Sequence, residues 1–410
     1  MPSLLHDHPG RDQIYGVTFD CVMGRATILA VVIMMQSNAV RCARNLLLAM
    51  ALLGHPWQTA LAKPTPLLCE PEGATADRPD DIPMRSHGLD EPPDRLSDGI
   101  SVSTLSAEGF LLEPIQELIT DLREGTYNKV DSVLVARHGK LVFEAYLNGF
   151  GRTTKHQTRS AFKSITSTLV GIAIDKGLIS SPDVPISTFF AEHWPKIASD
   201  RELKDKITVT DMLTMTPGFH VEEAFGVGPW RETDLWRADD WIRFSLDIPM
   251  AEQPGQQFRY SSPTTFLLGA IVAEAASMPL PRFAKENLFD PLGISNYCWT
   301  LSPKGRAIGM GSFYMLPRDM LKIGQMFLDG GSWKGRQVVS KEWVRQATKH
   351  IVDAVPPAKQ LDRPSASGYG FQWWTHTPRS FEDPRTQHYV AAGNGGQRIY
   401  VFPELDMVVV

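Results

Sequence analysis

A serine and a lysine lie three residues apart at the start of an apolar segment, in "RSAFKSITSTLVGIAIDKG" (159–177). Residues three apart share one face of a helix, so we expect Ser160 and Lys163 to meet. A serine hydroxyl is a weak nucleophile at neutral pH and needs a base, and a lysine can be that base when burial keeps it neutral. The spacing therefore predicts a nucleophile, Ser160, and its general base, Lys163.

The segment that follows Ser160 is expected to form a buried helix, because apolar side chains cover most of its circumference. Ser160 falls in the first turn, where free backbone N–H groups and the helix dipole favour developing negative charge. A chain of this length contains about one S-x-x-K by chance, and a serine at this position also suits a helix N-cap. Ser160 is nevertheless the only serine followed by a lysine at the third position, and no G-x-S-x-G provides a rival nucleophile.

This pair must be positioned by strands from both parts of the chain and by the helices between them. Two β-rich runs flank a turn in 131–149, which predicts a hairpin, and 397–410 repeats that pattern around its own turn. The helical patterns between these strands occupy 161–176, 208–214, 264–276 and 318–328. We therefore expect an α+β fold in which both chain ends build an antiparallel sheet flanked by helices. A mostly helical insertion would leave a cleft for the site.

The composition is that of a globular protein of 410 residues, 43% hydrophobic and 21% charged. The 41 basic and 46 acidic residues give a formal charge of −5 without a long run of either sign, so nucleic acid is not an expected partner. The four cysteines form no C-x-x-C, and the histidines lack zinc-ligand spacing, so no metal site is expected. Only Cys298 lies in the domain assigned below to catalysis. We therefore expect that disulfides do not hold that domain together.

Residues 1–62 are expected to form a leader. It contains two apolar runs of about ten residues, half of the ~20 that a membrane-spanning helix needs, so no stable membrane span is expected. The second run, 45–54, follows two arginines and precedes small residues that end at Ala62, which is the order of a secretory signal. This pattern predicts a periplasmic or secreted protein, with a cytoplasmic protein as the alternative.

The rest of the chain divides into an arm and a catalytic domain. Residues 63–97 are rich in proline and acidic residues and poor in periodic apolar residues, which predicts a linker or a loosely wrapped arm. Residues 98–410 carry all the periodic elements and are assigned to one domain. The chain stops at "MVVV", inside an expected strand.

Three ordered stretches resemble the motifs of the serine β-lactamase and penicillin-binding-protein superfamily. They are "SAFK" (160–163), "PGQQFRYSS" (254–262) and "AAGNGGQR" (391–398). The class C-like branch of esterases and 6-aminohexanoate-dimer hydrolases is the most similar, and intervening stretches such as "GYGFQWW" (368–374) also resemble it. The resemblance covers about 98–410. It implies a β-lactamase-like fold that usually continues into a C-terminal helix, so we expect this copy to lack that helix.

The resemblance also implies an activity and further catalytic residues. A serine hydrolase of this kind acts on a small-molecule ester or amide through an acyl-enzyme and needs no metal or organic cofactor. Tyr260 would exchange protons with the lysine and the leaving group, and Ser262 could hydrogen-bond into the same network. Taken without its neighbours, Tyr260 would be interpreted as an ordinary strand or loop aromatic, and its position after "PGQQF" and before an expected helix favours the catalytic role.

The glycine-rich third motif would complete an oxyanion hole. Its backbone N–H would act with that of Ser160, and Asn394 is the expected donor, with Gly396 as the alternative. Gly393, Gly395 and Gly396 would let the backbone approach the substrate closely. A β-bulge before the last strand is the structural alternative for these glycines.

Two departures from the family pattern bear on the substrate. The lysine of K-T-G, which helps to bind a substrate carboxylate, is replaced by Ala391 on one alignment and by Gly393 on the other, and Arg398 could take its place. The second motif ends in Ser262 instead of asparagine. Both changes favour an ester or amide that lacks the carboxylate over efficient β-lactam turnover.

Trp230 belongs to an aromatic-rich insertion, 220–250, and is expected to line the acyl or leaving-group pocket. Two other functions stay open on the sequence. One is a β-lactamase or D-alanyl-D-alanine peptidase, and the other is a binding homologue without catalytic activity.

Overall fold

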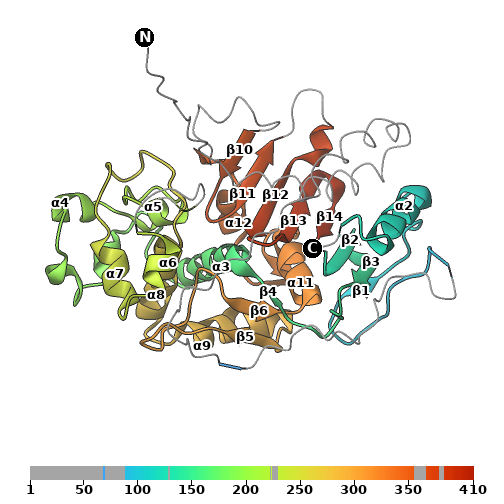
Figure 1. Cartoon of the computed structure of the whole chain (residues 1–410), viewed down its shortest axis with the longest axis horizontal. Helices are drawn as coiled ribbons and strands as arrows, with labels where there is room; N and C mark the ends of the chain where they lie inside the picture. Colours follow the sequence, from blue (N-terminus) through green and yellow to red (C-terminus); the bar gives the residue numbers. More distant parts are fainter. Residues whose placement is uncertain are drawn as a thin grey trace, which may run out of the picture.

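A central antiparallel sheet organises the fold (Figure 1). The computed structural model describes residues 68–69, 88–127, 130–221, 223, 230–354, 366–377 and 383–410. In that part of the chain the sheet has nine strands in the order β1-β3-β2-β14-β13-β12-β11-β10-β9. Its strands are β1 (Ser101–Val102), β2 (Ser132–Arg137), β3 (Lys140–Tyr146), β9 (Val352–Asp353), β10 (Ala366–Tyr369), β11 (Trp374–Thr377), β12 (His388–Gly393), β13 (Gln397–Phe402) and β14 (Met407–Val409).

Both ends of the domain meet in the middle of this sheet. The hairpin expected in 131–149 is formed by β2 and β3, which turn at His138 and Gly139. Strand β14 pairs antiparallel with β13 on one side and with β2 on the other, where Val408 lies opposite Ala136. Only β1 and β3 pair in parallel among the described strands of the sheet. The predicted α+β fold, with a sheet built from both chain ends, is confirmed.

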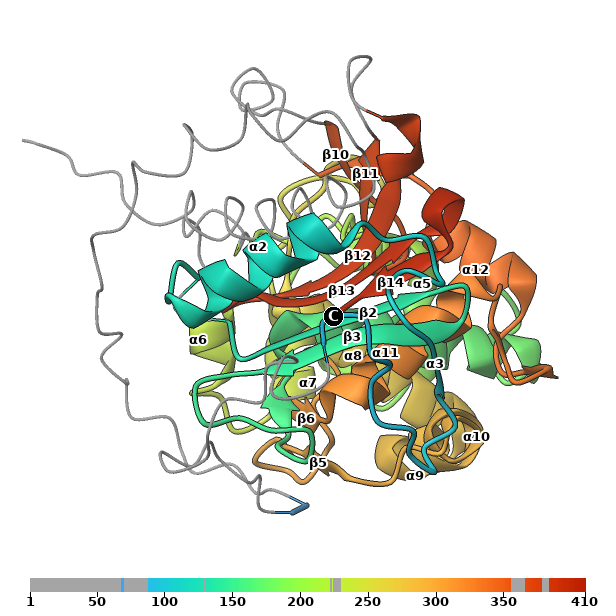
Figure 2. The same cartoon turned by 90° about the vertical axis from the view of Figure 1, so that its right-hand side faces the viewer.

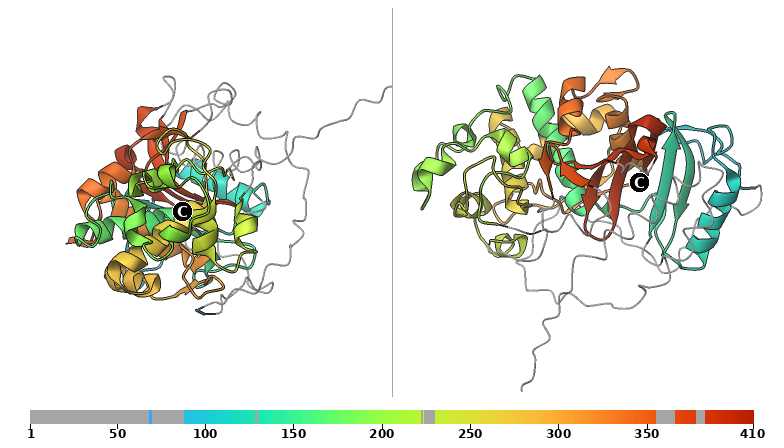
Figure 3. Two further views of the ribbon diagram at one scale, coloured as in Figure 1. Left: turned by 90° about the vertical axis from the view of Figure 1, so that its left-hand side faces the viewer. Right: turned by 90° about the horizontal axis from the view of Figure 1, so that it is seen from above.

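Helices cover both faces of the sheet, as the edge-on view shows (Figure 2). Helix α2 lies on one face, and α3, α8 and α11 lie on the other. The helices are α2 (Leu112–Arg123), α3 (Phe162–Asp175), α4 (Arg201–Lys204), α5 (Val209–Leu213), α6 (Glu232–Leu235), α7 (Trp241–Asp247), α8 (Ser262–Ala276), α9 (Leu280–Ala284), α10 (Asp290–Leu292), α11 (Pro317–Leu328) and α12 (Lys341–Ala347). The α4 to α8 region occupies one end of the molecule and α2 the other (Figure 3).

Smaller elements connect these layers. The strands β4 (His156–Gln157), β6 (Phe313–Met315) and β5 (Tyr297–Trp299) form one small sheet, and β7 (Ser332–Trp333) with β8 (Arg336–Gln337) forms a hairpin. Short helical turns are η1 (Arg159–Ala161), η2 (Ile186–Phe189), η3 (Trp194–Lys196), η4 (Lys285–Phe289), η5 (Pro384–Thr386) and η6 (Pro403–Leu405). Among the described residues, no single helix is long and apolar enough to cross a bilayer. Helix α8 and 280–292 meet that test only as a pair with an 80° bend.

The helices that carry the site begin and end close to where the sequence predicts. Helix α3 is buried along almost its whole length and stops before Gly177, whose φ of +72° suits glycine. Helix α8 begins at Ser262, two residues earlier than its apolar pattern indicates. The side chain of Ser261 accepts a hydrogen bond from Thr264 N, and Pro263 occupies the first turn, so capping sets the start.

Helix α11 packs against the inner face of the sheet at unusually short range. A Cβ added at Gly324 would lie 2.5 Å from Val408 Cγ1 and 2.8 Å from Ile399 Cγ2. Glycine is therefore required at this position of the helix, although glycine is a poor helix former. This contact fixes the distance between α11 and strands β13 and β14.

The N-terminal arm is attached to the domain by covalent and ionic contacts. Cys69 forms a disulfide with Cys298, 229 residues away. Buried Arg318 binds Glu144 at 2.7 Å and Asp98 at 3.0 Å, and it donates to the backbone oxygen of Asp94. The bond joins the arm to the domain and is not internal to 98–410, which contains only Cys298, and the sequence did not predict this attachment. The predicted leader lies outside the described residues.

Candidate active site

Ser160 and Lys163 are brought together by a short 3-10 turn that runs into α3. Ser160 lies in η1, directly after Arg159, which has a φ of +51°. Lys163 lies in the first turn of α3, with 1% of its surface exposed. Its Nζ is 3.2 Å from Ser160 Oγ. The predicted nucleophile and base are therefore in hydrogen-bonding contact, as their spacing requires.

Lys163 Nζ has three acceptors around it. Besides Ser160 Oγ, it donates to Ser262 Oγ at 3.0 Å and to the backbone oxygen of Met310 at 2.9 Å. Three is the number of protons that a lysine ammonium can donate. Ser262, at the start of α8, is fully buried. The structure thus joins the first and second motifs through the lysine.

Tyr260 contacts the lysine through the face of its ring. Lys163 Nζ lies 5.1 Å from the ring centroid, within the range of a cation–π interaction. The ring also stacks on Trp374, at 5.7 Å between centroids. Among the described residues, the Tyr260 hydroxyl makes no hydrogen bond to Ser160 or Lys163. The tyrosine therefore lies beside the pair and contacts Lys163 through its ring.

Two carboxylates hold Ser262, and the sequence did not predict either. Glu223 Oε2 accepts a hydrogen bond from Ser262 N at 3.0 Å, and Glu232 Oε2 accepts one from Ser262 Oγ at 3.0 Å. Burial, together with the nearby charge of Glu232, raises the pKa of Glu223 to about 7. Both residues come from the insertion, which has little periodicity. A pair of acidic residues there gave no signal apart from its position between two motifs.

The third motif lies against the turn that carries Ser160. Gly393 ends β12, and a Cβ at this position would lie 2.4 Å from the Thr158 backbone oxygen and 3.1 Å from Ala161 N. Asn394 follows in a turn with Gly395 and Gly396, which have φ values of +78° and +89°. The end of β12 is thus adjacent to η1, and the residue after Gly393 is the first of the turn.

Two other predicted residues, Arg398 and Trp230, make contacts within the protein. Arg398 Nη1 donates to the backbone oxygens of Gly393 and Gln397, so its guanidinium caps the hairpin. Trp230 packs on Phe244, at 5.2 Å between ring centroids, and against the main core. Trp230 is partly buried by these contacts, and its role in lining the acyl or leaving-group pocket stays a prediction.

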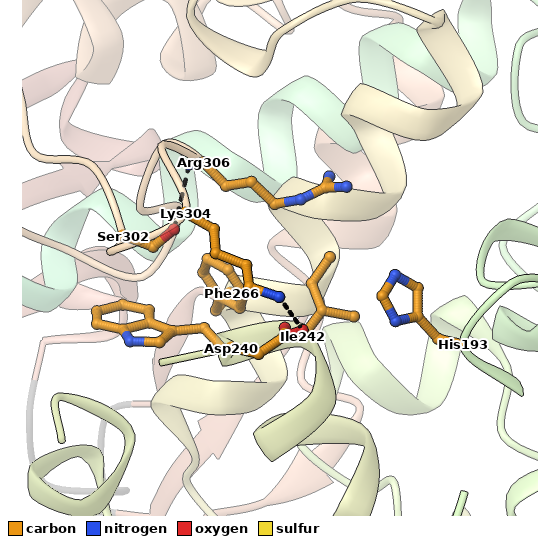
Figure 4. A pocket seen from close by; sticks show the side chains of 8 residues that line it. His193, Asp240, Ile242, Phe266, Ser302, Lys304 and Arg306 are labelled. Atoms are coloured by element: carbon orange, nitrogen blue, oxygen red, sulfur yellow. Dashed lines mark hydrogen bonds and ion pairs between the residues drawn. The ribbon is translucent and has the colours of Figure 1, made fainter. Parts of the chain in front are cut away.

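A surface pocket lies elsewhere in the helical region (Figure 4). Its lining includes His193, Phe266, Lys304 and Arg306, and none of the predicted site residues. Lys304 in this pocket binds Asp240 at 2.6 Å. Among the described residues, no group of three or more His, Cys, Asp or Glu side chains is arranged to hold a metal ion.

Comparison with known proteins agrees with the fold and with the family resemblance. The sequence profile of the β-lactamase family matches residues 115–410. The 6-aminohexanoate-dimer hydrolase of Paenarthrobacter ureafaciens is 26% identical over 305 residues, which cover 68% of this chain and 71% of that protein. The D-alanyl-D-alanine-carboxypeptidase/endopeptidase AmpH of Escherichia coli (strain K12) is 25% identical over 189 residues, 41% of this chain and 48% of that protein.

A solved structure supports the same assignment of the fold. EstCE1, a hydrolase with promiscuous acyltransferase activity, matches with a TM-score of 0.58 and 17% sequence identity over 75% of this chain and 92% of that one. The fold and the homologues define a serine hydrolase. The chain belongs to the β-lactamase family, within the superfamily that also contains the penicillin-binding proteins.

Proposed function

We propose that this protein hydrolyses a small-molecule ester or amide through an acyl-enzyme on Ser160. The observation that carries the proposal is the contact of Ser160 Oγ with Lys163 Nζ at 3.2 Å, next to the glycine edge of β12. A nucleophile in contact with a base, beside backbone N–H groups, is the arrangement that acyl transfer needs.

Each step of this acyl transfer is assigned to a residue of the site. Neutral Lys163 takes the proton from Ser160 Oγ as that oxygen attacks the carbonyl carbon. The N–H groups of Ser160 and Asn394 stabilise the oxyanion, and Tyr260 passes a proton to the leaving group. Water then releases the acyl group. The close approach of Gly393 to η1 supports Asn394, the next residue, as the donor in preference to Gly396.

The charges around the site favour a substrate without a carboxylate next to the reacting bond. With Gly393 as the glycine of the motif, Ala391 occupies the place of the family lysine, and it is fully buried. Arg398 is bound to backbone oxygens of the hairpin. The Glu232 carboxylate lies near Ser262, and Glu223 adds negative charge there as the pH rises above its pKa of about 7. An anionic substrate would therefore be repelled where the family usually attracts it.

The test compares matched neutral and anionic substrates. We expect hydrolysis of a 4-nitrophenyl acetate-type ester and of a neutral anilide, and at least about tenfold lower kcat/KM for the matching hemisuccinate ester. Lys163→Met, which keeps the volume and removes the base, should lose at least about 10²-fold in kcat/KM. Equal rates for Lys163→Met and the wild type would contradict the mechanism.

A second function, D-alanyl-D-alanine peptidase or β-lactamase, is favoured by the similarity to AmpH. Covalent retention of a fluorescent penicillin by the wild type, lost in Ser160→Ala, would support it. Absence of labelling in a preparation that hydrolyses neutral esters would exclude it. A folded protein that neither hydrolyses esters nor retains penicillin would be a binding homologue.

We also propose that the protein is exported. The disulfide between Cys69 and Cys298 supports this, because such bonds persist in oxidising compartments. N-terminal sequencing of protein recovered from the periplasm or medium tests it, and the expected new terminus follows Ala62. Recovery of uncleaved protein from the cytoplasm alone would contradict the proposal.

A further inference from the structure

The hydrogen bonds of the site continue past the lysine to a carboxylate. Ser160 Oγ, Lys163 Nζ, Ser262 Oγ and Glu232 Oε2 follow one another at 3.2, 3.0 and 3.0 Å. The other oxygen of the carboxylate is held by Trp236 Nε1 at 3.0 Å, so Glu232 is fixed at the end of this series. The three acceptors around Lys163 Nζ can accommodate the three protons of its ammonium form. An ammonium cannot take a proton from Ser160.

We propose that Glu232 is the proton acceptor that converts Lys163 into a base, with Ser262 as the relay between them. The inference rests on the proposed function and identifies a further residue for it. Lys163 Nζ–H breaks and the proton goes to Ser262 Oγ, while Ser262 Oγ–H breaks and that proton goes to Glu232 Oε2. The products are a neutral amine, a serine hydroxyl and a carboxylic acid, so one positive and one negative charge disappear together. The amine then takes the Ser160 proton.

The serine at position 262 suits this role better than the asparagine of the family pattern. A hydroxyl both donates and accepts, so it can pass a proton along a series of hydrogen bonds, whereas an amide donates without readily giving up its proton. Ser262 is also oriented from both sides, because Glu223 accepts from its backbone N–H at 3.0 Å. This chain therefore has a serine where the family pattern has asparagine, and it also has a carboxylate, Glu232, placed to receive the proton from that serine.

The relay predicts the shape of the pH profile. While Lys163 and Glu232 share one proton between them, its transfer changes no net charge, so kcat/KM should be independent of pH over that range. Without the carboxylate, Lys163 can lose its proton only to water, and kcat/KM should rise about tenfold for each pH unit. A purely electrostatic Glu232 would do the opposite, because it would stabilise the ammonium, and its loss would increase activity near neutrality.

The effects of other titratable groups near the relay on the pH profile must be distinguished from the effect of Glu232. Glu223 contacts Ser262 and has a pKa raised to about 7 by burial and by Glu232, and the Tyr260 ring lies 5.1 Å from Lys163 Nζ. Profiles are therefore recorded in the wild-type and Glu223→Gln backgrounds. Asp234→Asn is the matched control, because Asp234 belongs to the same helix as Glu232 but binds Arg231 N and not Ser262.

The experiment measures the rate of Ser160 labelling by a fluorophosphonate, and kcat/KM for a neutral ester, from pH 5 to 10. We expect Glu232→Gln to be about 10²-fold slower than wild type at pH 7, to gain about tenfold per pH unit, and to approach the wild type at high pH. Ser262→Asn should show the same slope, and the double variant should be no slower than either single variant. Asp234→Asn should keep the wild-type profile.

Three results would overturn the relay. Glu232→Gln could equal or exceed wild type near pH 7, its profile could run parallel to the wild type at all pH values, or Asp234→Asn could change the slope as Glu232→Gln does. Circular dichroism and thermal unfolding show that each variant is folded. If the wild type is active and any of these results is found, the relay is contradicted but the proposed function is not. If the folded wild type is not labelled, both the proposed function and the relay are contradicted.

Discussion

At the scale of residues, several groups of the candidate site are in contact with one lysine, Lys163, or with a residue that it contacts. Lys163 touches the predicted nucleophile, the second motif and a backbone oxygen, and Tyr260 lies against it by its ring face. The spacing of Ser160 and Lys163 predicted their contact because a helix turn fixes it. Glu223 and Glu232 could not be predicted. They reach Ser262 across 39 and 30 residues, and no local pattern encodes such contacts.

Tyr260→Phe tests the role of the phenol in leaving-group departure. An amine leaves poorly without a proton, whereas 4-nitrophenolate leaves readily as an anion. We therefore expect kcat/KM to fall about 10²-fold for a neutral amide and less than about tenfold for the 4-nitrophenyl ester with the same acyl group. Steady-state kinetics on this substrate pair provides the measurement. An equal loss on both substrates would assign Tyr260 to positioning.

At the scale of elements, the site depends on how closely β12 approaches η1. The strand hairpins and the main helices could be predicted from alternation and helical periodicity. The structure places β2 and β3 inside the predicted hairpin range, 131–149, and the ends of α3, α5 and α11 lie within a residue of their predicted ranges. The start of α8 differed because the Ser261 cap and Pro263 override the apolar pattern. The packing distance between β12 and η1 could not be predicted, since it depends on which atoms face Gly393.

Gly393→Ala should separate these two elements. The added Cβ would lie 2.4 Å from the Thr158 backbone oxygen, so β12 must shift and the oxyanion donors with it. We expect fluorophosphonate labelling of Ser160 to slow by about 10²-fold, because small misplacements of reacting groups have effects of that size. Gly335→Ala is the control, because a Cβ there would meet no atom within 4 Å, and its φ of +79°, unlike the backbone of Gly393, adds strain to the control and not to the test variant. Equal rates in the two variants would contradict this reading of β12.

At the scale of the whole molecule, stability depends on contacts that join distant parts of the chain. Strand β14 completes the centre of the sheet between β2 and β13. The disulfide and a hydrogen bond from Arg318 to the backbone oxygen of Asp94 attach the arm to the domain. The sequence predicted the joining of both chain ends in one sheet, but not the pairing of Cys69 with Cys298. Two cysteines far apart in sequence carry no local sign of being neighbours.

Reduction of the disulfide should lower stability without abolishing catalysis. A disulfide typically stabilises a protein by about 2–4 kcal/mol, largely by restricting the unfolded chain, and the effect is larger for longer loops. We expect a lower Tm with reductant and unchanged ester hydrolysis at 25 °C. The Cys69→Ser/Cys298→Ser double variant should have the lower Tm with and without reductant. A Tm that does not respond to reductant in the wild type would show that the bond does not stabilise the fold.

Acid should destabilise the protein through buried histidines. Burial lowers the pKa of His156 from 6.5 to about 4, so between these values the unfolded chain binds a proton that the folded chain does not. Stability from this group is complete above about pH 6.5 and is lost as the pH falls through about 4, by up to about 3 kcal/mol. In urea unfolding, His156→Phe, which can keep the stacking on Phe150, should lose less stability between pH 7 and 4 than wild type. An equal loss would contradict this account.

The central claim is that Ser160 is an activated nucleophile, and intact-mass measurement after incubation with a fluorophosphonate tests it most directly. Wild type and Ser160→Ala are compared at pH 8, after circular dichroism has shown both to be folded. We predict one covalent adduct on the wild type and none on Ser160→Ala. An unlabelled wild type, or an adduct that persists on Ser160→Ala, would contradict the account.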